Sequence, residues 1–238
     1  MNISTKAIVL SVIKYNEQDA VVKTYTEQTG FTAYFIRNFF KKNKSRLKKA
    51  YFQPANLLEL VATHKNKGQL EYIKEARIYY HYKNIHLNFD KLNVATFIRE
   101  VLLESLKNEQ ADTDLFRFIE HAFMQLDNEI FNPDFHVLFL LQLSRLLGFF
   151  PDNQTQGDYF DLYNGQFTDR IPPYKYLSPA DSLILKAYLG MIFDTKNTEK
   201  MTSADRKRAL DFLMDYYELH IAQFITPKSV KILHRIYE

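Results

Sequence analysis

A short run of basic residues is the feature of this sequence with the clearest chemical meaning. Residues 37–49 carry seven cations and no carboxylate, although the whole chain of 238 residues has a net charge of only +3. The cations are Arg37, Lys41, Lys42, Lys44, Arg46, Lys48 and Lys49. If the run is extended, alternate members project to one side, and such a row suits the phosphate backbone of a nucleic acid. The alternative is a solvated face that only keeps the protein soluble.

Aromatic residues flank the basic run and suggest a second kind of contact. Rings beside cations are typical of proteins that bind single-stranded nucleic acid, because phosphates are neutralised while bases stack on the rings. We expect three rings to form a stacking platform, namely Tyr34, Phe39 and Tyr51. The remaining three are expected in the protein core, namely Phe35, Phe40 and Phe52. No motif for reading base edges is present, so binding should be indifferent to sequence.

No arrangement of residues selects a catalytic or metal site. The chain has no cysteine, which excludes disulfides, thiolate zinc sites and thiol nucleophiles. The phosphate-binding GxxxxGK[ST] loop, the HExxH zinc motif and the GxSxG elbow are all missing. Acidic pairs such as Asp211 and Asp215 have the spacing of ordinary solvated surfaces. We therefore expect a binding protein that is not an enzyme and has no metal or cofactor.

The first 80 residues alternate between apolar and polar positions, which predicts β-strands. Five segments rich in β-branched and aromatic residues are separated by turn-forming residues; they are residues 5–15, 19–26, 31–37, 56–64 and 69–78. Five strands are too few for two packed sheets, whereas a small closed barrel leaves no exposed edge. We therefore predict a five-stranded OB-fold barrel in residues 1–80, with the basic run between its third and fourth strands.

After residue 80 the apolar residues recur at helical spacing, so residues 81–238 are predicted to form a helical domain. The segment before Pro151 is apolar nearly all round and should be its central helix, with Asn132 as N-cap and Pro133 at the first helical position. Thr202 and Asp205 have the spacing of a capping box at the start of a later helix. The fold class is therefore α+β.

One stretch of the helical domain has a different pattern. Residues 157–176 contain an Asn-Gly pair between two short alternating segments, which predicts an inserted β-hairpin. We expect its aromatic residues Tyr159, Tyr163 and Phe167 to hold it against the helices. Because no cysteine is present, metal cannot do this through thiolates.

Charge divides along the same boundary at residue 80. Residues 1–80 contain 14 Lys/Arg and 6 Asp/Glu, a net charge of +8, whereas residues 81–238 contain 17 and 22, a net charge of −5. This asymmetry favours a polyanion-binding module joined to a domain suited to protein partners. The N-terminus has no signal-peptide pattern and the longest apolar run has five residues, so we expect a cytoplasmic protein without a membrane span.

Several motifs resemble the RecO family of bacterial recombination mediators, in the same order along nearly the whole chain. Residues 7–30 resemble its opening, with an E-x-D pair at Glu17 and Asp19 between two strands. Residues 35–60 resemble its basic segment, which leads through Gln-Pro into an apolar strand. Residues 138–151 resemble its central helix, which ends in Leu-Gly-aromatic-x-Pro, and residues 226–238 its closing helix.

Two departures from the family pattern affect what the resemblance implies. Many members carry a four-cysteine zinc site just after the Leu-Gly-aromatic-x-Pro element, and this chain has the Asn-Gly hairpin there, so any zinc role is lost. The family's usual Lys-Gly after the third strand is replaced by Arg37 and Asn38. Asparagine tolerates a positive φ better than most residues, so the turn can still form.

The resemblance implies a function in DNA repair. RecO proteins bind single- and double-stranded DNA, anneal complementary strands, engage the acidic C-terminal tail of single-strand-binding protein, and act with RecR to load RecA. Annealing without a nucleotide cofactor is consistent with the missing phosphate loop. A member of this family would work in the cytoplasm at the nucleoid. Arg145, near the end of the apolar helix, is a candidate for receiving the acidic tail, and a structural role is its alternative.

Other functions share some of these features. An RNA-binding OB-fold module with a helical protein-docking domain would have the same charge map, and competition between DNA and RNA of equal length would distinguish it. An enzyme with a carboxylate site would require a deep polar pocket. The residues themselves leave these alternatives open.

Overall fold

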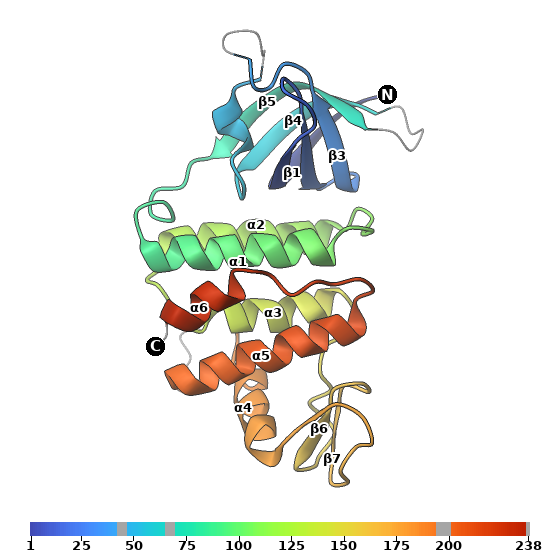
Figure 1. The fold of residues 1–238 in the computed structure, drawn as a ribbon, viewed down its shortest axis with the longest axis vertical. Coiled ribbons are helices and arrows are strands. Elements are labelled where there is room, and N and C mark those ends of the chain that lie inside the picture. The colour runs from blue at the N-terminus through green and yellow to red at the C-terminus, as the bar shows by residue number, and fades with distance from the viewer. Residues whose placement is uncertain (42–46, 65–69, 194–200, 237–238) are drawn as a thin grey trace. The chain divides into compact units, whose positions relative to one another are not determined.

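The structure is a computed structural model that describes residues 1–41, 47–64, 70–193 and 201–236. It consists of two compact units, Met1–Glu129 and Ile130–Glu238. In Figure 1 the first unit runs from blue to green and contains the five long strands, and the second runs from yellow to red. The predicted α+β class is confirmed, since a five-stranded sheet is followed by helices and a small separate sheet.

Five strands close into a barrel in the first unit. They are β1 (Asn2–Lys14), β2 (Ala20–Thr26), β3 (Gly30–Ile36), β4 (Leu57–Thr63) and β5 (Glu71–Tyr80). The order is β1-β2-β3-β5-β4, and β4 pairs back onto β1. All pairs are antiparallel except β3 with β5, which is parallel. Every strand therefore has two partners, and no edge is left unpaired, as expected for the OB-fold.

Alternation along the strands separates the inside of the barrel from the outside. Val9, Val22 and Leu60 are almost completely buried in one apolar cluster, and Tyr34 lies with them. The Tyr34 hydroxyl lies 3.0 Å from His64 Nε2, so the polar end of this buried ring has a partner. Burial raises the pKa of Tyr34 to about 12, and the hydroxyl stays protonated at neutral pH.

Two helices belong to the same compact unit as the barrel. They are α1 (Phe89–Ser105), capped by Asn88, and α2 (Thr113–Asn128), capped by Asp112. Arg99 of α1 donates a hydrogen bond to the backbone oxygen of Leu10 at 3.0 Å. The Tyr25 ring of β2 stacks on Phe116 of α2, with 6.4 Å between ring centroids. The compact units part at residues 129/130, and the chain changes from strand to helix after residue 80, where the expected domain boundary stays a prediction.

A buried carboxylate ties the connection between β5 and α1 to the end of α2. Asp127 is fully buried and accepts hydrogen bonds from the backbone N–H groups of Lys83, Asn84 and Ile85 at 2.8 to 3.1 Å. Burial alone would raise the pKa of Asp127, but these donors outweigh it and hold the pKa below its usual value. The ionised carboxylate therefore stabilises the fold of this unit.

The described residues of the second unit form four helices. They are α3 (Phe135–Leu146), α4 (Pro179–Leu189), α5 (Ser203–His220) and α6 (Val230–Ile236). Nine of the 12 residues of α3 are buried, which agrees with the expected central helix. The capping box predicted at Thr202 and Asp205 is present at the start of α5.

The start of α3 differs from the prediction by two residues. The helix begins at Phe135 with Asp134 as its N-cap, and Asn132 instead accepts a hydrogen bond from the Asp134 backbone N–H. The Asp134 side chain does not cap the helix. Its carboxylate accepts hydrogen bonds from Tyr188 at 2.8 Å and from Arg206 at 2.9 Å, and so connects α3 to α4 and α5.

The predicted hairpin is present and has a third strand. β6 (Tyr159–Asp161) pairs with β7 (Gln166–Thr168) around the Asn-Gly turn, and β8 (Tyr176–Leu177) pairs with β6. Phe167 is buried as expected, but Tyr163 is 62% exposed, so its expected packing role is wrong. Tyr163 lies in the turn, where its backbone N–H donates to Asp161 Oδ1 at 2.9 Å and its exposed ring lies 5.8 Å from that of Tyr174.

An aromatic cluster connects this small sheet to α5. We define the hairpin cluster by its rings, Phe149, Phe160, Phe167, Tyr216 and His220. Tyr216 is 2% exposed, its ring contacts Phe149 and Phe160, and its hydroxyl donates to the backbone oxygen of Phe149 at 2.9 Å. His220 Nε2 lies 2.9 Å from the backbone oxygen of Leu162. Ring packing and two hydrogen bonds to backbone oxygens therefore hold the sheet.

The Asp127 carboxylate is expected to stabilise the folded protein above pH 4. Replacing Asp127 with Ala leaves three backbone N–H groups without an acceptor and should lower the free energy of unfolding by about 3 kcal/mol. Because the folded pKa is below the unfolded value of about 3.9, this contribution is present above pH 4 and is lost as pH falls through the folded pKa. Urea unfolding at several pH values measures it. The exposed Asp114 on the same helix is the control, and an equal effect of Asp114→Asn would contradict the assignment.

The hairpin cluster is expected to hold the small sheet through Tyr216. Tyr216→Ala removes a buried ring and should lower the free energy of unfolding by about 3 to 5 kcal/mol. Tyr216→Phe loses only the hydroxyl and should cost about 1 kcal/mol. The exposed Tyr163 is the matched control, and Tyr163→Ala should leave the melting temperature nearly unchanged. Chelator treatment should not change it either, and a fall in melting temperature with chelator would show that metal holds this unit.

Candidate nucleic-acid interface and partner pocket

The basic run leaves the barrel at the end of β3 and returns at the start of β4. Arg37 follows β3 directly and is exposed, and Lys41 is partly buried. Lys48 and Lys49 are exposed at the start of a short 3₁₀ helix, η1 (Lys49–Phe52). The other three cations, Lys42, Lys44 and Arg46, lie outside the described residues. The expected row of alternating cations therefore stays a prediction.

Apolar residues anchor both ends of the run to the barrel. Phe39, Leu47 and Phe52 are at most 8% exposed and belong to the same apolar cluster as the barrel interior. The Phe39 and Phe52 rings meet edge to face, with 5.9 Å between centroids. Burying these three side chains fixes the described ends of the run to the barrel.

The turn between β1 and β2 holds the start of the run. Asn38 has a φ of 57°, the left-handed conformation that asparagine was expected to tolerate at this position. Its backbone N–H donates to Asp19 Oδ1 at 2.7 Å, and Asn16 Nδ2 donates to the other oxygen of Asp19 at 2.8 Å. The hydrogen bond from Asn38 holds the pKa of Asp19 below its usual value. The second acidic residue of the E-x-D pair is therefore a positioning residue for the basic run.

Two described cations of the run contact aromatic rings, whereas Arg37 and Lys41 act electrostatically on the Asp19 carboxylate. Lys48 Nζ lies 5.7 Å from the centroid of the Tyr51 ring, and Lys49 Nζ lies 5.2 Å from that of Phe40. Lys49 Nζ also donates to the backbone oxygen of Phe40 at 3.2 Å. Within the part of the chain that the structure describes, Arg37, Lys41, Lys48 and Lys49 form no ion pair. Their charge is available to a polyanion.

The expected stacking platform requires correction. Tyr34 is 0% and Phe39 4% exposed, so both rings are in the core and their expected role as an open platform is wrong. Tyr51 is partly buried beside Lys48. Phe52 is buried as predicted, whereas Phe35 and Phe40 are only partly buried. Neighbouring residues of a strand point to opposite faces, so placing Tyr34 inside the barrel places Phe35 outside it.

Sequence analysis therefore missed the aromatic residues that do lie on the outer face. The Phe35 ring meets Tyr15 edge to face at 5.3 Å and Tyr72 at 6.0 Å between centroids. Tyr15 and Tyr72 are 62% and 40% exposed. Alternation along β3 indicates that Tyr34 and Phe35 point to opposite faces of the strand. It does not indicate which face is inward, so the sequence alone could not identify Phe35 as the outer ring.

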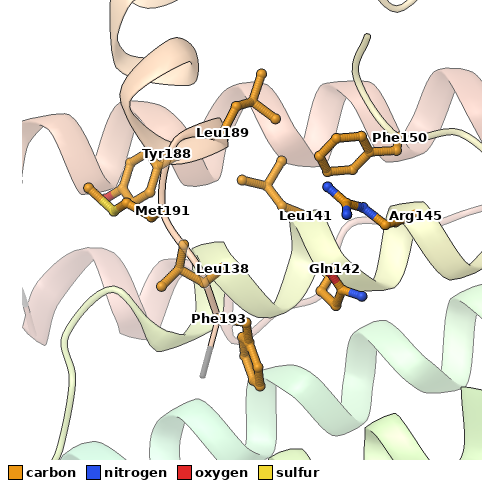
Figure 2. Close-up of a pocket in the computed structure, with 9 residues that line it drawn as sticks. All are labelled: Leu138, Leu141, Gln142, Arg145, Phe150, Tyr188, Leu189, Met191 and Phe193. Carbon is orange, nitrogen blue, oxygen red and sulfur yellow. The ribbon is translucent and has the colours of Figure 1, made fainter. Parts of the chain in front are cut away.

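A small pocket in the second unit contains Arg145, the residue proposed to receive an acidic partner (Figure 2). Its lining comes from α3, α4 and the segments that follow them, and comprises Leu138, Leu141, Gln142, Arg145, Phe150, Tyr188, Leu189, Met191 and Phe193. Figure 2 shows the Arg145 guanidinium beside the Phe150 ring, and the two lie 4.0 Å apart. Arg145 is exposed and forms no ion pair with any residue that the structure describes. A pocket lined mostly by apolar residue types, with one available cation, suits a partner that has apolar and acidic groups.

Buried hydrogen bonds fix one wall of this pocket. The Tyr188 ring is 1% exposed, and its hydroxyl donates to Asp134 at 2.8 Å. Burial, together with the neighbouring Asp134 carboxylate, raises the pKa of Tyr188 far above its usual value, so it remains a donor. Arg206 donates to the same carboxylate and balances its charge. The pocket is therefore lined by side chains that are held in place before any partner binds.

The described residues contain neither a cluster of metal-ligating side chains nor a helix that could cross a membrane. Across residues 1–41, 47–64, 70–193 and 201–236, no group of three or more His, Asp or Glu side chains is placed to hold a metal ion. Over the same ranges, no helix combines the length and apolar character that a bilayer crossing requires.

Comparison with known proteins places the chain in a family. The family profile described as "Recombination protein O N terminal" matches residues 1–82, and "Recombination protein O C terminal" matches residues 86–159. The chain is 37% identical to the DNA repair protein RecO of Flavobacterium psychrophilum and to that of Christiangramia forsetii, in both cases over 100% of each chain. It is 30% identical to the DNA repair protein RecO of Porphyromonas gingivalis, again over 100% of each chain. The chain belongs to the RecO family of DNA repair proteins.

Proposed function

We propose that this protein is a recombination mediator that binds single- and double-stranded DNA and anneals complementary strands. The observation that carries the proposal is the basic run, which is anchored to an OB-fold barrel and whose described cations Lys48 and Lys49 are exposed beside aromatic rings. Such cations release counterions from DNA on binding, so affinity comes from phosphates and is independent of sequence. Neutralising two backbones lowers their mutual repulsion, and base pairing then drives annealing without a nucleotide cofactor.

The second unit supplies the protein contacts in this proposal. The pocket around Arg145 receives the acidic C-terminal tail of single-strand-binding protein, with a tail carboxylate on the guanidinium and apolar side chains against Leu138, Leu141 and Phe193. RecR is the second partner, and the assembly helps to load RecA onto DNA coated by single-strand-binding protein. Family membership supports these partners, and the exposed guanidinium held against Phe150 supports the place of the tail. The function would be carried out at the nucleoid in the cytoplasm and requires no catalysis.

The basic run is expected to set the salt dependence of DNA binding. If about six of its cations each neutralise one phosphate, the slope of log affinity against log salt is about −5 for duplex DNA and about −4 for single strands. Replacing Lys42, Lys44, Arg46 and Lys48 with Ala should make the slope shallower by about 3 to 4 units. Fluorescence anisotropy at several salt concentrations measures it.

A matched control removes charge from the other unit. Lys228 and Lys231 are exposed, and replacing both with Ala should leave the slope unchanged. An unchanged slope in the folded quadruple variant would mean that the basic run is only a solubilising face.

The Arg145 pocket is expected to bind the acidic tail independently of DNA. Arg145→Glu places a carboxylate against the tail and should weaken binding of a fluorescent tail peptide by more than about tenfold. Arg145→Lys keeps the charge but loses the planar contact with Phe150, so its effect should be smaller. DNA affinity should change less than about twofold in both variants.

The control for the pocket is the same charge change elsewhere on the second unit. Lys228→Glu should leave tail binding within about twofold of the unaltered protein. If Lys228→Glu and Arg145→Glu weaken tail binding equally, the effect comes from net charge and the pocket assignment is wrong.

A further inference from the structure

A row of apolar side chains crosses the outer face of the barrel from β1 to β5. The strand register places Ile13 opposite Val21, Val21 opposite Phe35, and Phe35 opposite Tyr72. Residues directly opposite one another in a sheet share a face, so these side chains are neighbours on one surface. Tyr15 joins them through its edge-to-face contact with Phe35. We call these five residues the aromatic row.

The aromatic row is open although it is apolar. Ile13, Tyr15 and Tyr72 are 45%, 62% and 40% exposed. The helices of the same unit contact other parts of the barrel: Tyr25, further along β2, packs on Phe116 and is fully buried. The Phe35 ring meets the Tyr15 and Tyr72 rings edge to face. The row therefore offers a surface on which flat aromatic groups can stack.

Cations border the row on the same surface. Lys23 lies two residues beyond Val21 on β2 and so shares the outer face with the row. Lys74 is exposed at a bulge of β5 two residues beyond Tyr72, and its ammonium donates to Asn2 at 3.0 Å. Arg37, which begins the basic run, lies two residues beyond Phe35. Two acidic residues lie near Tyr15 in this turn: Glu17 is engaged by Lys14 at 2.8 Å, and Asp19 accepts hydrogen bonds from the Asn38 backbone and from Asn16. The occupant that fits is therefore anionic along its backbone and carries flat apolar groups.

We propose that the aromatic row is a stacking platform for the unpaired bases of single-stranded DNA. This inference rests on the proposed DNA-binding function. The basic run contacts phosphates and so binds single strands and duplexes alike. The aromatic row contacts base faces, which are open in a single strand and stacked within a duplex. The row thus distinguishes single strands from duplexes, and a newly annealed duplex loses its contacts with the row while keeping those with the basic run.

The test separates bases from phosphates. Full-length protein with Tyr15→Ala and Tyr72→Ala is compared with the unaltered protein on three ligands: a thymidine oligonucleotide, an abasic oligonucleotide of equal length, and a duplex. Stacking on an aromatic ring adds about fivefold to more than a hundredfold in affinity per base. The double variant should therefore bind the thymidine oligonucleotide at least about tenfold more weakly and the other two ligands within about twofold, with an unchanged salt slope.

The second unit offers a matched pair of tyrosines as the control. Tyr163 and Tyr174 are 62% and 69% exposed and their rings lie 5.8 Å apart, yet no basic run adjoins them. Replacing both with Ala should change none of the three affinities. Equal weakening by the control pair, or equal loss on the abasic oligonucleotide, would overturn the assignment.

Tryptophan fluorescence gives a direct measurement, since the chain has no tryptophan. In Tyr72→Trp protein, saturating thymidine oligonucleotide should quench the single introduced tryptophan by stacking, and the abasic oligonucleotide should not. Tyr163→Trp should report no quenching with either. If the unaltered protein binds no DNA, the proposed function and the stacking platform both fail. If it binds DNA and the Tyr72→Trp protein shows no quenching, only the stacking platform fails.

Discussion

The parallel pairing of β3 with β5 closes the barrel, and most of the other features of the first unit depend on it. Tyr34 pairs with Glu71 and Phe35 with Tyr72, so this short contact sets which side chains of β3 face inward. Once Tyr34 is inside, its hydroxyl finds His64 and Phe35 must be outside. A shift of one residue would exchange the two rings and remove both the satisfied core and the exposed aromatic surface.

Closure also explains how a run of like charges can be held in one place. Seven cations in thirteen residues repel one another, and no local secondary structure would hold them together. Phe39, Leu47 and Phe52 bury their side chains with the barrel interior and fix the ends of the run, while Asp19 binds the Asn38 backbone. Lys48 and Lys49, the described cations beside these anchors, are exposed and contact aromatic rings.

The second unit holds its small sheet by aromatic packing. Tyr216 fills the space between Phe149 and Phe160, and its hydroxyl and His220 contact backbone oxygens, so ring contacts connect the three-stranded sheet to α5. A metal fixes a small sheet with four short bonds, whereas rings need buried area. The aromatic residues after the Leu-Gly-aromatic-x-Pro element therefore hold the small sheet in a chain that has no cysteine.

Local signals in the sequence were enough to predict the barrel, the helices, the hairpin and the place of the basic run. These signals are alternation in residues 1–80, helical spacing afterwards, the Thr202–Asp205 capping box, the Asn164–Gly165 turn and a block of like charges. Long-range packing determined which rings face outward, that α1 and α2 belong with the barrel, and that Asp127 is a buried anchor. Adjacent aromatic residues such as Tyr34 and Phe35 fit either face of a strand, and the pairing with β5 selects one. The role of Asp127 likewise requires backbone donors more than forty residues away, which no local pattern can reveal.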